Sequence, residues 1–119
     1  MLRTRLALVT LLVAALVAVA SASAATPTLT GTDGPGFTIT LKKGTSKVSS
    51  LKAGKYKFVI KDMSNIHNFH LTGPGINKKT GVSFKGETTW TIKLKPGRYT
   101  YQCDPHAASG MKGTFKVTR

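Results

Sequence analysis

Apolar and polar residues alternate with a period of two through most of the chain after residue 36. Phe37, Ile39 and Leu41 share one face, and Thr38, Thr40 and Lys42 share the other. Similar alternation recurs in residues 56–61, 90–95, 99–103 and 114–118. Because successive side chains of a strand point to opposite faces of a sheet, this pattern predicts strands with one buried face.

Turn-forming residues separate these stretches. They are Lys43-Gly44, Ala53-Gly54, Gly73-Pro74-Gly75, Lys79-Thr80-Gly81 and Pro96-Gly97. Beyond residue 25 no window has a convincing helical stripe. Short strands at regular spacing, separated by glycine and proline, are typical of a β-sandwich. We therefore predict an all-β domain over residues 37–119. Residues 25–36, rich in Thr, Gly and Pro, are expected to form a flexible leader before it.

The first 24 residues have the pattern of a secretory signal peptide. A basic start with Arg3 and Arg5 precedes an apolar run over residues 6–20, and Ala22 and Ala24 supply the small residues of a cleavage site. The apolar run is shorter than the roughly 20 residues that span a bilayer. We expect cleavage and export to the periplasm, the cell envelope or the extracellular space; retention as an uncleaved membrane anchor is the alternative.

The chain is strongly basic, with 18 Lys and Arg against 4 Asp and Glu and a formal net charge of +14. Loss of the two signal-peptide arginines leaves 16 basic residues against the same 4 acidic ones. The lysines are scattered rather than clustered, and no nucleic-acid recognition motif accompanies them. We therefore expect no nucleic-acid binding, and a surface that attracts acidic partners or anionic envelope polymers.

The strongest chemical signal is the run from Cys103 through His106 to Met111, together with His67 and His70, the other two histidines of the chain. Thiolate, imidazole and thioether suit copper, and trigonal Cys-His-His coordination with a weak axial Met is the geometry of a blue-copper site. A lone cysteine in an exported protein cannot form an internal disulfide, so a metal explains Cys103 better than a free thiol does.

The spacing of the upstream histidines leaves one choice open. In an extended strand His67 and His70 point to opposite faces, so the two cannot easily bind one ion. Met63 lies four residues before His67 and could in principle compete with Met111 as the axial ligand. We expect Met63 to serve in packing instead.

Two segments resemble the plastocyanin-like cupredoxins, which are type 1 blue copper proteins. Pro96-Gly97-Arg98-Tyr99 leads to a loop with Cys103, two residues, His106, four residues and Met111, and His67-Asn68 resembles the first ligand of that family. The resemblance implies a cupredoxin-like Greek-key β-sandwich. It also implies one type 1 copper per chain with His67, Cys103, His106 and Met111 as ligands. Asn68 would brace the Cys103 loop by hydrogen bonds, and His70 would not be a ligand.

The function that this resemblance implies is transfer of single electrons between redox partners. The alternative is a copper-binding or copper-buffering protein of the envelope without a redox role, which the few Met and His residues disfavour. An enzyme such as an oxidase would need a second copper cluster with more histidines, so we expect no catalytic activity. We expect the protein to act as a monomer.

Two features bear on the route of the electron. Gln102 stands where photosynthetic plastocyanins, by resemblance, have an aromatic residue beside an acidic docking patch, and the chain has few acids to build one. We therefore expect electrons to pass through the ring edge of His106. Its predicted apolar rim consists of Ile66, Pro74, Pro105, Ala107 and Ala108.

Overall fold

The computed structural model describes residues 13–19 and 24–119. The basic start of the predicted signal peptide, and most of its cleavage site, lie outside the described residues. Residues 13–19 and 24–27 have no regular secondary structure. Within the described part of the chain, no helix is long and apolar enough to cross a bilayer.

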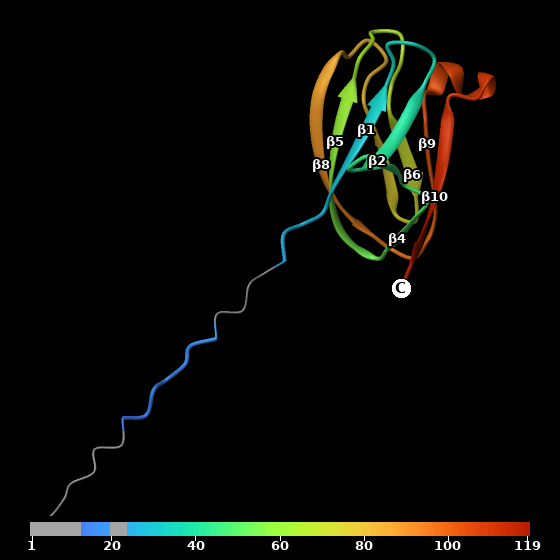
Figure 1. The fold of residues 1–119 in the computed structure, drawn as a ribbon. Helices are drawn as coiled ribbons and strands as arrows, with labels where there is room; N and C mark the ends of the chain where they lie inside the picture. Colours follow the sequence, from blue (N-terminus) through green and yellow to red (C-terminus); the bar gives the residue numbers. More distant parts are fainter. Residues whose placement is uncertain (1–12, 20–23) are drawn as a thin grey trace, which may run out of the picture.

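Two five-stranded sheets pack face to face (Figure 1). The first has the order β3 (Ser46–Lys47), β2 (Ile39–Lys43), β1 (Thr28–Asp33), β5 (Gly54–Asp62) and β8 (Gly86–Leu94). The second has the order β4 (Ser50–Lys52), β10 (Lys112–Thr118), β9 (Gly97–Gln102), β6 (His70–Gly73) and β7 (Ile76–Lys79). A short 3-10 helix, η1 (Asp104–Ser109), joins β9 to β10. The predicted all-β sandwich is confirmed.

The start of the domain differs from the sequence-based expectation. Residues 28–33, expected in a flexible leader, form β1, which lies inside the first sheet between β2 and β5. Leu29 is fully buried, and a Cβ on Gly31 would lie only 2.8 Å from the ring of Phe69. The leader prediction was wrong because two of the three buried positions of β1 are Gly31 and Asp33, which hydropathy patterning does not register as buried.

Aromatic side chains fill the space between the sheets. Phe69 stacks on Tyr101 with ring centroids 5.6 Å apart, and Tyr99 stacks on Phe115 at 5.1 Å. A Cβ on Gly113 would lie 2.3 Å from the ring of Tyr101, so only glycine leaves room for that ring. Burial of such rings supplies much of the free energy that stabilises a small domain.

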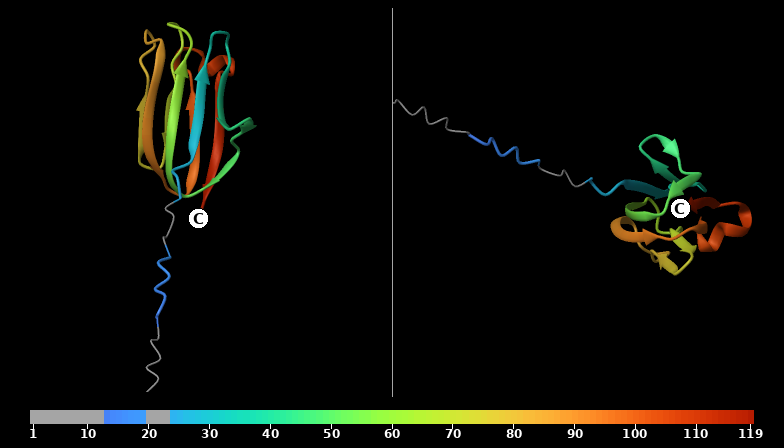
Figure 2. Two further views of the ribbon diagram at one scale, coloured as in Figure 1. Left: turned by 60° about the vertical axis from the view of Figure 1, so that its left-hand side comes forward. Right: turned by 90° about the horizontal axis from the view of Figure 1, so that it is seen from below.

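The strand directions gather four loops at one end of the sandwich. Asp33 pairs with Asp62 in the parallel register of β1 and β5, and His70 pairs with Gln102 across β6 and β9. The loops that follow β1, β5, β7 and β9 therefore meet at the end that carries η1 (Figure 2). The start of β1 and the C-terminus both lie at the opposite end of the sandwich (Figures 1 and 2). All of the predicted ligands belong to this loop-bearing end.

Candidate metal centre

Three potential ligand atoms converge at the loop-bearing end. His67 Nδ1 lies 3.0 Å from His106 Nδ1, and Cys103 Sγ lies 3.6 Å and 3.4 Å from these two nitrogens. The point equidistant from the three atoms lies about 1.9 Å from each of them. This is close to the roughly 2.0–2.3 Å of the bonds that imidazole nitrogen and thiolate sulfur make to zinc, an ion similar in size to copper. The donor set is borderline to soft, which fits copper.

His67, Cys103 and His106 are the one group of at least three His, Cys, Asp or Glu residues arranged to hold a metal within the described residues. His67 and Cys103 are fully buried, and His106 is half-buried. His67 Nε2 is buried and meets no protein hydrogen-bond partner there, whereas Nδ1 faces the other two ligand atoms. The ring of His67 is therefore oriented to present Nδ1 to an ion.

The ligand loop is shaped by backbone hydrogen bonds. Cys103 follows β9 in an extended conformation, and the amide of His106 donates to the Cys103 carbonyl at 3.1 Å, which closes the turn between them. Gly110 has φ 95°, a left-handed conformation that favours glycine, and reverses the chain. Met111 then accepts a hydrogen bond from the Cys103 amide at 3.0 Å and is 2% exposed. The turn and the bend together bring Cys103, His106 and Met111 into one short loop.

His67 lies in the loop before β6 rather than in a strand, so the expected extended alternation is absent there. His67, Asn68 and Phe69 are all buried. Gly34 packs closely over His67, because a Cβ at this position, where φ is 71°, would lie 3.1 Å from His67 Cδ2. Burial of three consecutive side chains lets Phe69 anchor the core while His67 faces the metal loop.

Asn68 braces the metal loop, as the resemblance implies. Its Oδ1 accepts a hydrogen bond from the Asp104 amide at 2.7 Å, and its Nδ2 donates to Asp104 Oδ2 at 3.0 Å. Burial raises the pKa of Asp104, but hydrogen bonds from Gln102, Asn68 and His70 outweigh it and lower that pKa to about 2. Asp104 is therefore a carboxylate at neutral pH.

The other sequence candidates lie away from the ligand atoms. His70 is outside the metal-ligating group, and its two ring nitrogens lie 2.8 Å from Asp104 Oδ1 and 2.6 Å from Asn77 Oδ1. Met63, expected to pack, is 45% exposed. Pro74 lies beside Gly97 at the far end of β9 from Cys103, so its predicted place in the His106 rim is wrong.

Phe37 is the residue at this centre that the sequence pattern misassigned. The alternation places it with Ile39 and Leu41 in the core, but β2 begins at Ile39 and Phe37 is 66% exposed. Its ring makes edge contacts with His67 and His106, with centroids 5.2 Å and 4.8 Å apart. The preceding Gly34-Pro35-Gly36 turn was the available signal that the strand starts later.

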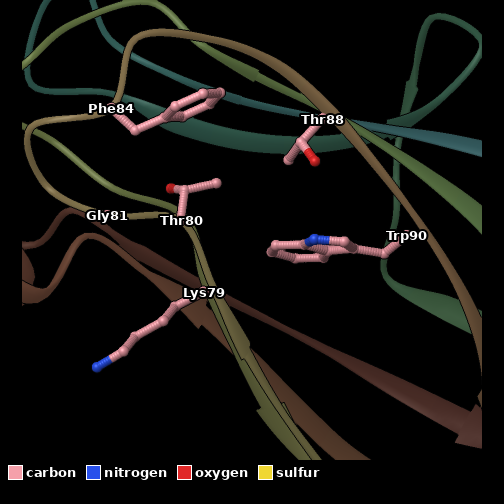
Figure 3. Close-up of a pocket in the computed structure, with 6 residues that line it drawn as sticks. All are labelled: Lys79, Thr80, Gly81, Phe84, Thr88 and Trp90. Carbon is pink, nitrogen blue, oxygen red and sulfur yellow. The ribbon is translucent and has the colours of Figure 1, made fainter.

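A separate hollow lies between the outer strands β7 and β8. It has a volume of about 210 Å³, and Figure 3 shows its lining residues Lys79, Thr80, Gly81, Phe84, Thr88 and Trp90. The rings of Phe84 and Trp90 flank the two threonines, and the Lys79 ammonium points away (Figure 3). None of the predicted metal ligands lines this hollow.

A sequence model of the copper binding proteins of the plastocyanin/azurin family matches residues 28–118. The chain belongs to this family. The match begins at the first residue of β1, which agrees with the corrected start of the domain. Family membership and the convergence of His67, Cys103 and His106, with Met111 on the same loop, fit a single type 1 copper as the cofactor of an electron-transfer protein.

Solved structures of copper proteins share the fold. A rusticyanin structure matches with a TM-score of 0.61 and 22% identity over 81% of this chain and 80% of the other. Rusticyanin from Thiobacillus ferrooxidans in another structure matches with a TM-score of 0.52 and 24% identity over 81% and 79%. Auracyanin B matches with a TM-score of 0.51 and 20% identity over 82% and 94%. These likenesses establish the cupredoxin β-sandwich.

Proposed function

We propose that this cupredoxin is exported and carries single electrons between redox proteins, with His67, Cys103, His106 and Met111 as the ligands of one copper ion. The observation that carries the assignment is the convergence of two imidazole nitrogens and one thiol sulfur within 3.6 Å of one another. When bound, copper supplies a one-electron couple between Cu(I) and Cu(II). We infer no catalytic role beyond this transfer.

The chain's contribution is to hold the ligands in one arrangement. Cys103, His106 and Met111 are tied to one another by backbone hydrogen bonds, and the two ligand histidines contact Phe37. Ligands that are held in place need little rearrangement when the charge at the centre changes. Such pre-organisation keeps the barrier to electron transfer low.

The surface supports docking at the His106 end. Outside residues 13–19, the large apolar side chains that are exposed in the described chain all lie in the loops at this end: Phe37, Met63, Ile66, Val82 and Phe84. Two of the four acidic residues, Asp33 and Asp62, are buried, so the surface is more positive than the composition indicates. We infer that partners present an apolar contact surrounded by acidic groups.

Copper loading tests the proposed ligand set. Protein lacking the signal segment should turn intensely blue with Cu(II), because thiolate-to-copper charge transfer absorbs visible light, and Cys103→Ser should remove the band entirely. The measurement is the visible absorption spectrum of the loaded proteins. Loaded wild-type protein that stays colourless would exclude the type 1 assignment.

Two histidine variants provide the matched control for that test. His67→Ala should lose the blue band, because His67 Nδ1 belongs to the converging group. His70→Ala should keep it, because the ring of His70 is occupied by Asp104 and Asn77. The reverse result would make His70 the ligand. A reversible one-electron wave in voltammetry would support an electron carrier over a copper buffer.

Reaction with an acidic redox protein should depend steeply on salt. The Debye length falls from about 10 Å at 0.1 M to about 3 Å at 1 M ionic strength, so attraction between the basic surface and an acidic partner is screened. We expect the second-order rate constant in stopped-flow experiments to fall by roughly tenfold or more over this range. Reduction by a neutral small molecule is the control, and equal salt dependence for both reductants would contradict electrostatic docking.

A further inference from the structure

Three polar side chains contact the carboxylate of Asp104, the residue that follows Cys103. Asp104 Oδ1 lies 2.8 Å from His70 Nδ1 and accepts a hydrogen bond from Gln102 Nε2 at 3.0 Å. Asp104 Oδ2 accepts from Asn68, which in turn accepts from the Asp104 amide. The far side of the His70 ring meets Asn77 at 2.6 Å. We call Asn68, His70, Asn77, Gln102 and Asp104 the carboxylate clasp.

The clasp joins the two segments that bear the metal ligands. Asn68 directly follows His67, and Asp104 directly follows Cys103, so their reciprocal pair links positions 36 residues apart. His70 and Asn77 extend this link into the hairpin of β6 and β7, which is paired in register with β9. By themselves, Asn68 and Asp104 could move together. The contacts of His70 with Asp104 and with Asn77, which we call the His70 arm, tie this pair to the second sheet.

We propose that Asp104 is a positioning residue that, through the His70 arm, restricts movement of the Cys103–Met111 loop and thereby sets the rate of electron transfer. This inference rests on the proposed function in taking Cys103 and His106 as copper ligands. The brace implied by family resemblance involves Asn68 alone, and the carboxylate with its histidine arm adds a second tether. Hydrogen bonds to an ionised carboxylate are stronger than those between neutral groups, which suits Asp104 to this role.

The position of Asp104 also gives the clasp an electrostatic effect. Its negative charge lies one residue from the Cys103 thiolate and favours the more positive, oxidised state of the centre. Geometry and charge can be separated by variants. Asp104→Ala removes both carboxylate oxygens. His70→Ala removes the arm and keeps the carboxylate, and Glu87→Gln removes one exposed acidic charge on β8, outside the clasp.

The test measures electron self-exchange of copper-loaded protein by NMR line broadening and hydrogen exchange of the apoprotein amides over residues 103–111. Asp104→Ala should slow self-exchange about tenfold, and His70→Ala should reproduce most of that loss while the blue band persists. In the apoprotein both variants should speed amide exchange in the loop by roughly tenfold. Glu87→Gln should change neither quantity.

The reduction potential separates positioning from charge. It should rise in Asp104→Ala, which loses the nearby charge, and change little in His70→Ala, which retains it. Self-exchange and loop exchange rates that match wild type in both Asp104→Ala and His70→Ala would overturn the inference. A wild-type protein that never turns blue would instead refute the proposed function, while the apoprotein exchange data would still test the clasp.

Discussion

We expect the apoprotein to lose stability between about pH 4 and pH 8, and replacing Asp33 with asparagine should remove most of that loss. Asp33 and Asp62 end the parallel strands β1 and β5 in register, and both point into the sandwich. Asp62 accepts hydrogen bonds from the Ser64 amide and the Thr80 hydroxyl. Asp33 is fully buried, and no protein donor within the described residues reaches either of its carboxyl oxygens.

Burial, which is the larger cause, and the charge of the neighbouring Asp62 raise the pKa of Asp33 from 3.8 to about 8. Below pH 4 this carboxyl is protonated in both the folded and the unfolded chain. Between pH 4 and pH 8 the unfolded chain loses the proton and the folded chain keeps it. The free energy of unfolding therefore falls as pH rises through this window, with a maximal slope of about 1.4 kcal/mol per pH unit. Above pH 8 this contribution levels off.

Urea unfolding of the apoproteins at several pH values measures this effect. The difference in unfolding free energy between Asp33→Asn and wild type should favour the variant increasingly from pH 4 to pH 8, because a neutral amide has no proton to retain. Glu87→Gln, which alters an exposed carboxylate, is the control and should show no such trend. If the unfolding free energies of wild type and Asp33→Asn changed with pH in parallel across this window, Asp33 would not be protonated in the folded chain.

Sequence patterning predicts two kinds of feature in this molecule: strands with a regular hydrophobic period, and a loop that holds an unusual set of side chains. β5, β9 and the second half of β8 have large apolar residues at alternate positions, so alternation identifies them. The metal loop combines three uncommon ligand types at short spacing in a chain with one cysteine. Both features are local in the sequence, which is why they can be interpreted without a structure.

Features that depend on distant segments were not predictable in this way. Gly31 contributes to the core because Phe69, 38 positions later, fills the space beside it. Phe37 leaves the expected strand face because the rings of His67 and His106, from other loops, offer it a contact. Asp104 is bound by Asn68 and His70, which lie 36 and 34 positions earlier in the chain, and its sequence neighbours give no sign of either. In each case tertiary contacts determine what local pattern leaves undecided.

Phe69→Ala should destabilise the apoprotein by about 3–5 kcal/mol, a large share of the 5–15 kcal/mol that stabilises a typical domain. The ring is fully buried, stacks on Tyr101, and is near Trp90, with centroids 6.4 Å apart. Its removal leaves a cavity between the two sheets. The Phe69 backbone is also paired with Thr80, through its amide to the Thr80 hydroxyl and its carbonyl to the Thr80 amide. The chain around the cavity is therefore held in place and cannot easily collapse.

The measurement is the urea midpoint and slope of the apoproteins, with Phe37→Ala as the matched control. Phe37 is the same residue type at the same end of the sandwich, but it is 66% exposed, and its loss should cost less than about 1 kcal/mol. Phe69→Leu should fall between the two because it refills part of the cavity.

Because Phe69 lies two residues after His67, its alanine variant should also weaken copper binding, visible as a reduced blue band at limiting Cu(II). Equal losses of stability in Phe69→Ala and Phe37→Ala would show that the loop-bearing end, rather than the core beneath it, limits the stability of the fold.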